Sequence, residues 1–436
     1  MTKRYHNSLE FSSLKRRKVE VNFEGGDITS DGGVILLREM DKRMGLTDAI
    51  NKAIPDPRRQ GACQHSQKAL LKQRIYGLAL GYEDLNDHTA LRRDGAMQAA
   101  AGEIRSLASA STLCRLENRA TQAAAFDLHK VLVNQFIASF KAPPRQLILD
   151  FDATHDLVHG NQEGRHFNRF YDGYCFLPLY VFCGTQLLTS YLRSASRGGA
   201  HHTPAVLKLL VKALRQAWPK VRLIIRADAG FCSPRLLNWC DRNRVDYLIG
   251  MGKNSALTRH ANHLIDLAET LYQIDKKPQK LFDEFDYQAG SWKRSRRMIV
   301  KAEHNACGEN TRYVVTSLKG TAKRLYQKIY CARGNMENCI KEQKSLFSDR
   351  TSCHHWWPNQ FRVLLSGLAY VLMDAFRRVG LASTELYRAQ MDTIRNRLLK
   401  VGGVVIRNTR RIVIQLCSHF SARNIVEKAH ENLLSG

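Results

Sequence analysis

The stretch Leu147–Ala153, LILDFDA, is the segment that decides the fold. Its apolar residues predict a buried strand, and Pro143-Pro144 just before it mark a boundary. Side chains two apart on a strand share a face, so Asp150 and Asp152 point to the same side. Buried carboxylates are costly unless they are paired or bind a metal ion. The strand therefore predicts an acidic site, and the structural alternative is a pair of residues that cap a turn.

The next hundred residues alternate between strand and helix patterns. VRLIIRA is a second buried strand, and Asp228 follows it directly. An aspartate just past a strand end lies where open α/β sheets place their ligands, although a structural turn aspartate fits the same position. With the first strand, the expected order is β, β, β, α, β, α, β, with further strands at about 172–183, 186–192, 221–227 and 245–250 and helices at about 203–217 and 233–242.

The stretch Tyr330–Lys344, YCARGNMENCIKEQK, places polar side chains on one face of an expected helix. Residues three, four and seven apart share a helix face, which groups Tyr330, Arg333, Glu337 and Lys344. A lone carboxylate among cations suits a site that holds a metal ion and a phosphate together. Gly334-Asn335 could kink or restart this helix. The plain alternative is an amphipathic surface helix with ordinary charge pairs.

The chain is strongly basic. Its 436 residues include 67 Lys and Arg against 40 Asp and Glu, a formal net charge of +27 with a pI near 9.8. A surplus of this size indicates a polyanionic partner, most often nucleic acid, with a basic ribosome-like or membrane-surface protein as the alternative. The length suffices for two or three domains with a substantial core.

Cysteine usage and hydropathy indicate a cytoplasmic protein. The eleven cysteines form no C-x-x-C pair, which fits free thiols in a reducing compartment. The N-terminal residues contain no apolar run and do not resemble a signal peptide. The uncharged run 174–192 contains Pro178 and Gly184 and is rich in β-formers, which favours two strands joined by a turn over a membrane-spanning helix.

Three further regions surround this core. Residues 1–140 are expected to be mainly helical, with a basic tail that includes the run Lys15–Lys18 and with the paired bases Arg58-Arg59 and Arg92-Arg93, and to bind DNA ends. Residues of about 253–325 contain alternating runs that predict a β-rich insertion. Residues 379–436 are expected to form a helix, a hairpin and a helix, with dimerisation or DNA contact as a possible role.

The insertion contains one candidate base-stacking residue, Trp292, in the segment SWKRSRR. Flanking cations would let this ring stack on an unpaired base, and a buried or interfacial tryptophan is the alternative. The cations counted with it as DNA-binding are Lys293, Arg294, Arg296 and Arg297.

The spacing Tyr, two residues, Arg, three residues, Glu, six residues, Lys resembles the signature of a large group of bacterial insertion-sequence DDE transposases. In that group the Glu is the third member of an Asp-Asp-Glu metal triad. The first Asp of the group stands in a D-x-T setting, which Asp152 matches, while Asp228 matches the second Asp and Glu337 the third. Asp150 remains the alternative first ligand. Together, the segments TSDGGVILL, LDFDATHD, RADAGF and RGNMENCIKE look most like the insertion-sequence family numbered thirteen-eighty.

The resemblance implies an α/β fold with a ribonuclease H-like catalytic core. That core would be a mixed five-stranded sheet with helices, within residues 141–378, and it would carry the β-rich insertion. A mainly helical N-terminal DNA-binding region and a mainly helical C-terminal region would flank it.

The resemblance also implies a chemistry. Asp152, Asp228 and Glu337 would hold two Mg²⁺ ions, for which Mn²⁺ would substitute. Phosphates of the cut strand would be held by Tyr330, Arg333, Lys341 and Lys344. The enzyme would nick double-stranded DNA at element ends and join the 3′-hydroxyl ends to target DNA, as a homodimer in the DNA synapse within the bacterial cytoplasm, associated with the nucleoid. The alternatives are a metal-dependent nuclease without strand transfer and an inactive DNA-binding protein.

Overall fold

The computed structural model describes residues 8–435 and contains two compact units. The central unit runs from Glu117 to Val371. The terminal unit combines the chain up to Leu116 with the chain from Leu372 onward. These divisions differ from the boundaries expected at residues 140 and 378. The first division comes earlier because helix α7 (Gln122–Ala138) packs on strand β9 (Gln186–Tyr191) of the central unit.

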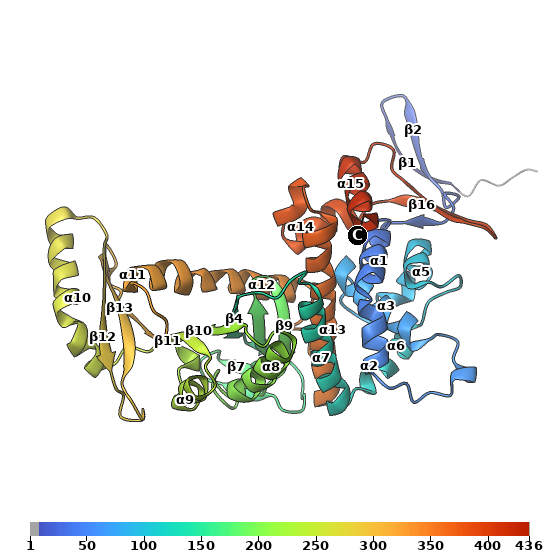
Figure 1. The fold of residues 1–436 in the computed structure, drawn as a ribbon. Coiled ribbons are helices and arrows are strands. Elements are labelled where there is room, and N and C mark those ends of the chain that lie inside the picture. The colour runs from blue at the N-terminus through green and yellow to red at the C-terminus, as the bar shows by residue number, and fades with distance from the viewer. Residues whose placement is uncertain (1–7, 436) are drawn as a thin grey trace, which may run out of the picture. The chain divides into compact units, whose positions relative to one another are not determined.

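The central unit is built on one mixed sheet of nine strands (Figure 1). The strand order is β12-β13-β15-β11-β10-β4-β8-β9, and β14 pairs with β13. Strands β4 and β11 both run parallel to β10, and the other neighbours are antiparallel. The remaining bounds are β4 (Gln146–Ala153), β8 (Leu179–Cys183), β10 (Arg222–Ala227), β11 (Asp246–Met251), β12 (Gln279–Tyr287), β13 (Arg296–Asn305), β14 (Gly308–Glu309) and β15 (Arg312–Thr316).

The uncharged run 174–192 forms strands, as predicted from its β-formers. Strands β8 and β9 form a hairpin whose turn contains Gly184 at φ +62°, a conformation that favours glycine. The start of the run lies in β7 (Gly173–Phe176), the middle strand of a small sheet between β5 (Asp156–Leu157) and β6 (His166–Asn168). Among residues 8–435, no helix has the length and apolar character needed to cross a membrane.

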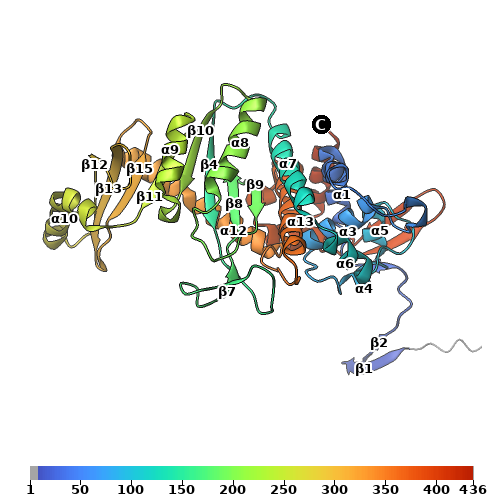
Figure 2. The ribbon, with the colours of Figure 1, turned by 90° about the horizontal axis from the view of Figure 1, so that it is seen from below.

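Helices cover both faces of the strands at the middle of this sheet (Figures 1 and 2). On one face, Leu147, Leu149 and Phe151 of β4 pack in a core with α7, α8 (Thr203–Ala217) and α9 (Pro234–Arg242). The intervening residues of β4, which include Asp150 and Asp152, face the other side.

A continuous helical segment crosses that other side. It consists of α11 (Ala322–Arg324), the π-helical turn η3 (Leu325–Tyr330), the 3-10 turn η4 (Cys331–Arg333) and α12 (Gly334–Ser345). Ile224 of β10 and Leu248 of β11 pack against Leu325 and Tyr326 of η3. The expected signature helix therefore lies over the face that carries the aspartates of β4.

The expected insertion adds strands to the main sheet and also contains a long helix. Strands β12, β13 and β15 extend the sheet through the pairing of β15 with β11. Before them comes α10 (Ser255–Asp275), whose N-cap Asn254 accepts a hydrogen bond from the Leu257 amide. Leu257, Ala261 and Leu264 form the buried stripe of α10, which packs on β12 and β13. The insertion is thus α/β, whereas only its strands were predicted. Beyond α12, helix α13 (Trp356–Ala375) carries the chain out of the central unit.

The terminal unit is mainly helical and contains both ends of the chain. Strand β3 (Ile28–Thr29) pairs with β16 (Gly403–Arg407), and β16 pairs with β17 (Ile412–Leu416). Helix α1 contacts both α5 and α15. The helices and helical turns are α1 (Val34–Met44), α2 (Leu46–Ala53), η1 (Gln60–Ala62), α3 (Gln67–Leu80), α4 (His88–Leu91), α5 (Gly95–Ala101), α6 (Ala110–Asn118), η5 (Phe376–Gly380), η6 (Glu385–Arg388), α14 (Met391–Ile394), η7 (Arg395–Leu399) and α15 (Arg423–Leu434).

The basic N-terminal tail expected from the sequence forms a hairpin over its described part. Strands β1 (Leu9–Leu14) and β2 (Arg17–Val21) pair antiparallel, and the basic run Lys15–Lys18 includes their turn. The first seven residues of the expected tail lie outside the described part of the chain.

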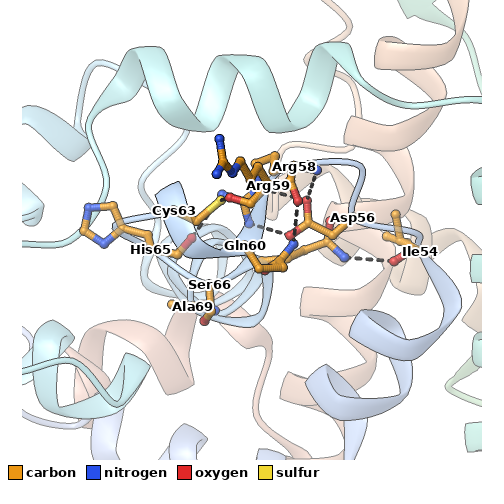
Figure 3. Close-up of polar contacts among 10 residues, drawn as sticks. Ile54, Asp56, Arg58, Arg59, Gln60, Cys63, His65, Ser66 and Ala69 are labelled. Carbon is orange, nitrogen blue, oxygen red and sulfur yellow. Dashed lines mark hydrogen bonds and ion pairs between the residues drawn. The ribbon is translucent and has the colours of Figure 1, made fainter.

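The paired bases Arg58-Arg59 have different environments (Figure 3). Arg58 donates from Nε and Nη2 to the two carboxylate oxygens of Asp56, at 2.8 and 2.7 Å, and from Nη1 to the carbonyl oxygen of His65 at 3.0 Å. Arg59 is exposed. Arg58 therefore holds the loop between α2 and α3 in shape, which leaves Arg59 as the better candidate for contact with a polyanion.

Candidate active site

Two of the predicted carboxylates stand at neighbouring strand ends. Strands β4 and β10 are parallel, and Phe151 is the partner of Ala227 at the end of their pairing. One residue further along each chain come Asp152 and Asp228. Asp152 Oδ1 accepts a hydrogen bond from the amide of Ala153 at 2.9 Å, and Asp228 Oδ1 accepts one from the amide of Gly230 at 2.8 Å. These bonds leave the Oδ2 atom of each carboxylate free to meet a cation.

One guanidinium reaches both of these oxygens. Arg333 donates from Nη1 to Asp152 Oδ2 at 3.2 Å and from Nη2 to Asp228 Oδ2 at 3.4 Å. Both contacts are long for charge-assisted hydrogen bonds, which are about 2.7–2.9 Å in ordinary cases. Arg333 therefore balances the charge of the two aspartates without saturating them.

Burial raises the pKa of Asp152 to about 6. Arg333 opposes this shift, while the neighbouring charges of Asp228 and Glu337 add to it. Burial also acts to lower the pKa of Arg333, but Asp152 and Asp228 outweigh it and raise that pKa. The site thus holds more negative charge than one arginine compensates, which is a setting that attracts a further cation.

Glu337 lies in the first turn of α12, four residues after Arg333, and its side chain is exposed. The helix restarts at Gly334, where the 3-10 turn gives way to α12, and Arg333 (φ −58°) and Gly334 (φ −54°) both keep right-handed helical dihedrals. The winding changes twice along this segment, from π-helical in η3 to 3-10 in η4 and then to α-helical in α12, which begins at Gly334. A π-helical turn inside a helix is frequent at functional sites.

Tyr330 lies beside Asp228 because the neighbouring residue of β11 is a glycine, Gly250, which leaves room for the Tyr330 hydroxyl. A Cβ placed on Gly250 would lie 2.5 Å from the Tyr330 hydroxyl, 2.9 Å from the Ala229 amide nitrogen and 3.2 Å from the Asp228 carbonyl carbon. Burial raises the pKa of Tyr330, so its hydroxyl stays protonated and can donate a hydrogen bond. Gly250 is a residue of the site that the sequence analysis did not single out.

The two lysines of α12 differ. Lys341 is exposed. Lys344 donates to the His155 carbonyl oxygen at 3.0 Å and lies 3.7 Å from the carboxylate of Asp156. Asp156 is buried, and burial raises its pKa to about 8 despite the opposing charge of Lys344. Lys344 is therefore tied to the segment just after β4, which the sequence analysis did not foresee.

Asp150, the alternative first ligand, is fully engaged elsewhere. Arg226 donates from Nε to Asp150 Oδ1 at 2.5 Å and from Nη2 to Oδ2 at 2.7 Å. Arg226 Nη1 also donates to the carbonyl oxygen of Ile329, in the turn just before Tyr330. The structure brings Asp152, and not Asp150, to Asp228. Arg226, flanked by apolar residues near the end of the buried run VRLIIRA, was the sequence signal that could have pointed to this pair.

The insertion residues predicted to bind DNA are mostly engaged within the protein. Trp292 is 5% exposed, packs edge-on against Tyr287 and lies under the guanidinium of Arg296, 5.1 Å from the ring centre. This environment does not offer the ring to an unpaired base, so the buried alternative describes Trp292. The long-range packing of β12 and β13 produces that burial, and no local pattern announces it.

Three of the four cations near Trp292 are paired within the protein. Arg296 bonds to Asn238 and Asp241, both at 2.8 Å, and Arg294 lies 2.6 Å from Asp241. Arg297 bonds to the Leu318 carbonyl oxygen at 2.6 Å and to Glu284. Lys293 is exposed and is the best placed of the four to contact DNA.

The residues present fit a divalent cation. Within residues 8–435, no three or more His, Cys, Asp and Glu side chains are placed to share one metal ion. The Oδ2 atoms of Asp152 and Asp228 nevertheless converge on one cationic group, and carboxylate oxygen is the ligand that Mg²⁺ prefers. Glu337 is near enough for its charge to raise the pKa of Asp152.

Fold and site together define a class of α/β protein in which carboxylates at the ends of parallel strands meet a helix that carries cations. The model of one family, the transposase DDE domain, group 1, matches residues 11–435, and the chain belongs to this family. This match confirms the prediction of a DDE transposase.

No curated protein matches the sequence. Among solved structures, the piggyBac transposase synaptic complex with hairpin DNA is similar, with 12% sequence identity, 86% of this chain and 80% of that chain covered, and a TM-score of 0.43.

Proposed function

We propose that the protein is the transposase of a bacterial insertion sequence, most like the family numbered thirteen-eighty. It binds the terminal inverted repeats, hydrolyses phosphodiester bonds at the element ends and joins the 3′-hydroxyl ends to target DNA. Its catalytic core is of the ribonuclease H-like type. This part of the proposal is supported by the five adjacent strands β11-β10-β4-β8-β9 of the main sheet.

One observation carries this proposal. Asp152 and Asp228 stand side by side at the ends of two parallel strands, and Arg333 of the signature segment reaches both. Positioning and charge neutralisation supply most of the rate in phosphoryl transfer. A site that gathers acidic oxygens and an arginine at the ends of two central strands can supply both positioning and charge neutralisation.

DDE transposase domains in general use divalent metal ions. Here Asp152, Asp228 and Glu337 would hold two Mg²⁺ ions, or Mn²⁺ in their place, which would activate the nucleophile and stabilise the leaving oxygen. Arg333, which balances both aspartates in the protein alone, can turn its planar fork to a phosphate of the bound strand. The protonated Tyr330 hydroxyl can donate to the same phosphate, and the exposed Lys341 lies along the same helix.

Two further parts of the proposal concern the setting. The substrate is double-stranded DNA, which the formal charge of +27 favours. We place the enzyme in the bacterial cytoplasm, at the nucleoid, working as a homodimer because two element ends must be joined to one target.

The test is a cutting and joining assay with purified full-length protein. The substrates are a labelled duplex taken from the DNA that flanks its own coding sequence and a supercoiled target plasmid, with Mg²⁺ or with EDTA. Wild type runs beside Asp152→Asn, Asp228→Asn and Glu337→Gln. Asp246→Asn, a carboxylate at the opposite end of β11 that pairs with Arg222, is the matched control.

Joined product that needs the metal ion, disappears in the three site variants and persists in Asp246→Asn supports a transposase. Metal-dependent cutting without joining would replace it with a nuclease. Binding without cutting, identical in all variants, would leave a DNA-binding protein and overturn the assignment of the site.

A further inference from the structure

The segment just after β4 gathers exposed aromatic rings beside the site. Strands β6 and β7 place Phe167 opposite Tyr174, and both side chains are nearly half exposed, at 43% and 47%. Phe170, in the turn between these strands, is 87% exposed. Large apolar rings seldom gather at one place on a protein surface without a ligand or partner.

These rings form an ordered group. Tyr171 stacks on His155 with ring centres 4.2 Å apart and an interplanar angle of 19°. Phe170 meets Tyr171 edge-on at 4.9 Å, and Phe167 meets Tyr174 edge-on at 5.5 Å. We call Phe167, Phe170, Tyr171 and Tyr174 the aromatic platform.

The turn that carries Phe170 has a defined conformation. Asn168 Oδ1 accepts a hydrogen bond from the amide of Phe170 at 3.0 Å, and the Asn168 carbonyl oxygen accepts one from the amide of Tyr171 at 3.1 Å. The Asn168 side chain donates to the carbonyl oxygen of Ala195 at 3.3 Å, which ties the turn to the rest of the central unit. A turn held this way loses little backbone freedom when it binds a ligand.

The platform lies close to the catalytic carboxylates. Tyr171 and Ala153, the residue next to Asp152, pack against the same small cluster of Cys175, Leu177 and Ala195. Burial raises the pKa of Tyr171, and the charges of Asp152 and Asp228 add to that shift. His155, the stacking partner of Tyr171, accepts the hydrogen bond of Lys344 at its carbonyl oxygen. A strand held at the site would thus pass the platform.

Cations are interleaved with these rings. The guanidinium of Arg165 lies over the ring of Tyr174, 4.3 Å from its centre. Arg169 is exposed, next to Phe170. Exposed aromatic faces alternating with arginines are the chemistry that binds unpaired nucleotides, because every base has a face that stacks and every nucleotide carries a phosphate.

We infer that the aromatic platform binds an unpaired or flipped-out nucleotide of the DNA strand near the cut, with Phe170 and Tyr174 stacking on the base. This inference rests on the proposed function, because it takes the strand at Asp152 and Asp228 to be DNA. It replaces Trp292, whose ring is buried, as the base-stacking residue of this chain.

The experiment separates this inference from the proposed function because it measures binding without chemistry. In EDTA, fluorescence anisotropy follows full-length protein binding to a labelled single-stranded oligothymidylate and to a blunt duplex of the same length. The variants are Phe170→Ala, Tyr174→Ala and Phe170→Trp. Phe126→Ala is the matched control, since Phe126 on α7 is 46% exposed and has Lys130 over its ring at 4.6 Å.

A stacked base contributes about 1–3 kcal/mol, so each alanine variant should bind the single strand about 5- to 150-fold more weakly. Duplex binding should change by less than about twofold, and Phe170→Trp and Phe126→Ala should bind like wild type. A second readout uses 2-aminopurine in an unpaired end of a duplex, whose fluorescence should be quenched by wild type and not by Phe170→Ala.

Equal single-strand affinity for wild type and Phe170→Ala would overturn the inference, even if cutting and joining proceed normally. A Phe170→Ala variant that changes only the oligomeric state in sedimentation would overturn it in favour of a protein interface. Ring-dependent binding in a protein that cuts nothing would keep the platform and sink only the transposase assignment.

Discussion

Two groups of carboxylate and arginine occupy the same face of the same strands and are built in opposite ways. Asp150 and Arg226 are both buried and form two short hydrogen bonds, at 2.5 and 2.7 Å. Asp152 and Asp228 share one arginine, Arg333, through single contacts of 3.2 and 3.4 Å. A carboxylate whose oxygens are saturated by a fixed arginine has no capacity left for a metal ion or a substrate.

Asp150 and Asp152 are only two residues apart on β4, and their different partners give them different roles. Arg226 also donates to Ile329, so the Asp150 pair joins the sheet to the turn that precedes Tyr330. The Asp150–Arg226 pair positions the signature segment, whereas Asp152 and Asp228 contact Arg333 of that segment.

The largest effect is expected at the loosely satisfied pair. Asp228→Asn keeps the shape of the side chain and removes the charge, so cutting should fall by on the order of 10³-fold, the effect of several kcal/mol of lost metal and charge stabilisation. The side chain of Asp228 is 41% exposed, so the thermal midpoint should barely move. Initial nicking rates and thermal unfolding measure the two quantities, and an unchanged rate would contradict the role of Asp228.

The saturated pair should show the reverse. Arg226→Met leaves the buried carboxylate of Asp150 without its partner, which should lower the free energy of unfolding by about 3–5 kcal/mol in urea titrations. Arg222→Met is the control on the same strand. Its ion pair with Asp246 is largely exposed, so the loss should stay below about 1 kcal/mol. Equal losses in the two variants would remove the contrast.

Gly250→Ala should displace Tyr330 and the backbone beside Asp228 without unfolding the protein. The added methyl group would overlap the Tyr330 hydroxyl and crowd the backbone of Ala229, which cannot yield as a side chain can. A displacement approaching 1 Å costs about 10²-fold in rate, so nicking should fall by up to that factor. Gly252→Ala, whose Cβ would have no neighbour within 4 Å, should cut like wild type.

A third acid–cation pair, Asp156 and Lys344, combines a buried carboxylate with a partly exposed lysine at 3.7 Å. Burial raises the pKa of Asp156 to about 8, so the folded protein holds this proton more tightly than the unfolded chain. The stabilisation is complete below the unfolded pKa near 4 and is lost as the pH rises toward 8. Wild type should therefore lose stability relative to Asp156→Asn between pH 5 and pH 8, by about 3–4 kcal/mol, because one pKa unit corresponds to about 1.4 kcal/mol. Parallel pH profiles of the urea midpoint in the two proteins would show that Asp156 does not titrate in this range.

Much of the central unit could be predicted from local pattern. The amphipathic helix expected at 203–217 is α8 (Thr203–Ala217), and the strand expected at 221–227 is β10 (Arg222–Ala227). Helix α8 has one apolar face and Pro204 in its first turn, and β10 is a short run that is buried on both faces of the sheet. Asp152 and Asp228 were found because each ends a strand that is itself easy to recognise.

What escaped prediction depends on partners far away in the chain. Pairing of Thr29 with Gly403 joins the two ends of the chain in one unit, and neither segment carries a local sign of the other. The roles of Asp150 and Asp152 could not be separated on the strand itself, because the choice is made by Arg226 on β10. Trp292 has the flanking cations of a DNA contact, and only the assembled insertion shows that its ring is covered.

The terminal unit has a consequence for the time course of synthesis. Its two parts are separated by the central unit, Glu117 to Val371, whose length is 371 − 116 = 255 residues. At about 5–20 residues per second, the ribosome makes the second part roughly 13–50 s after the first. During that interval β3 has no β16 to pair with, and α1 has no α15 to cover it. A message truncated shortly after Val371 would therefore encode every residue of the acidic site and leave the first-made helices without the segment that completes them.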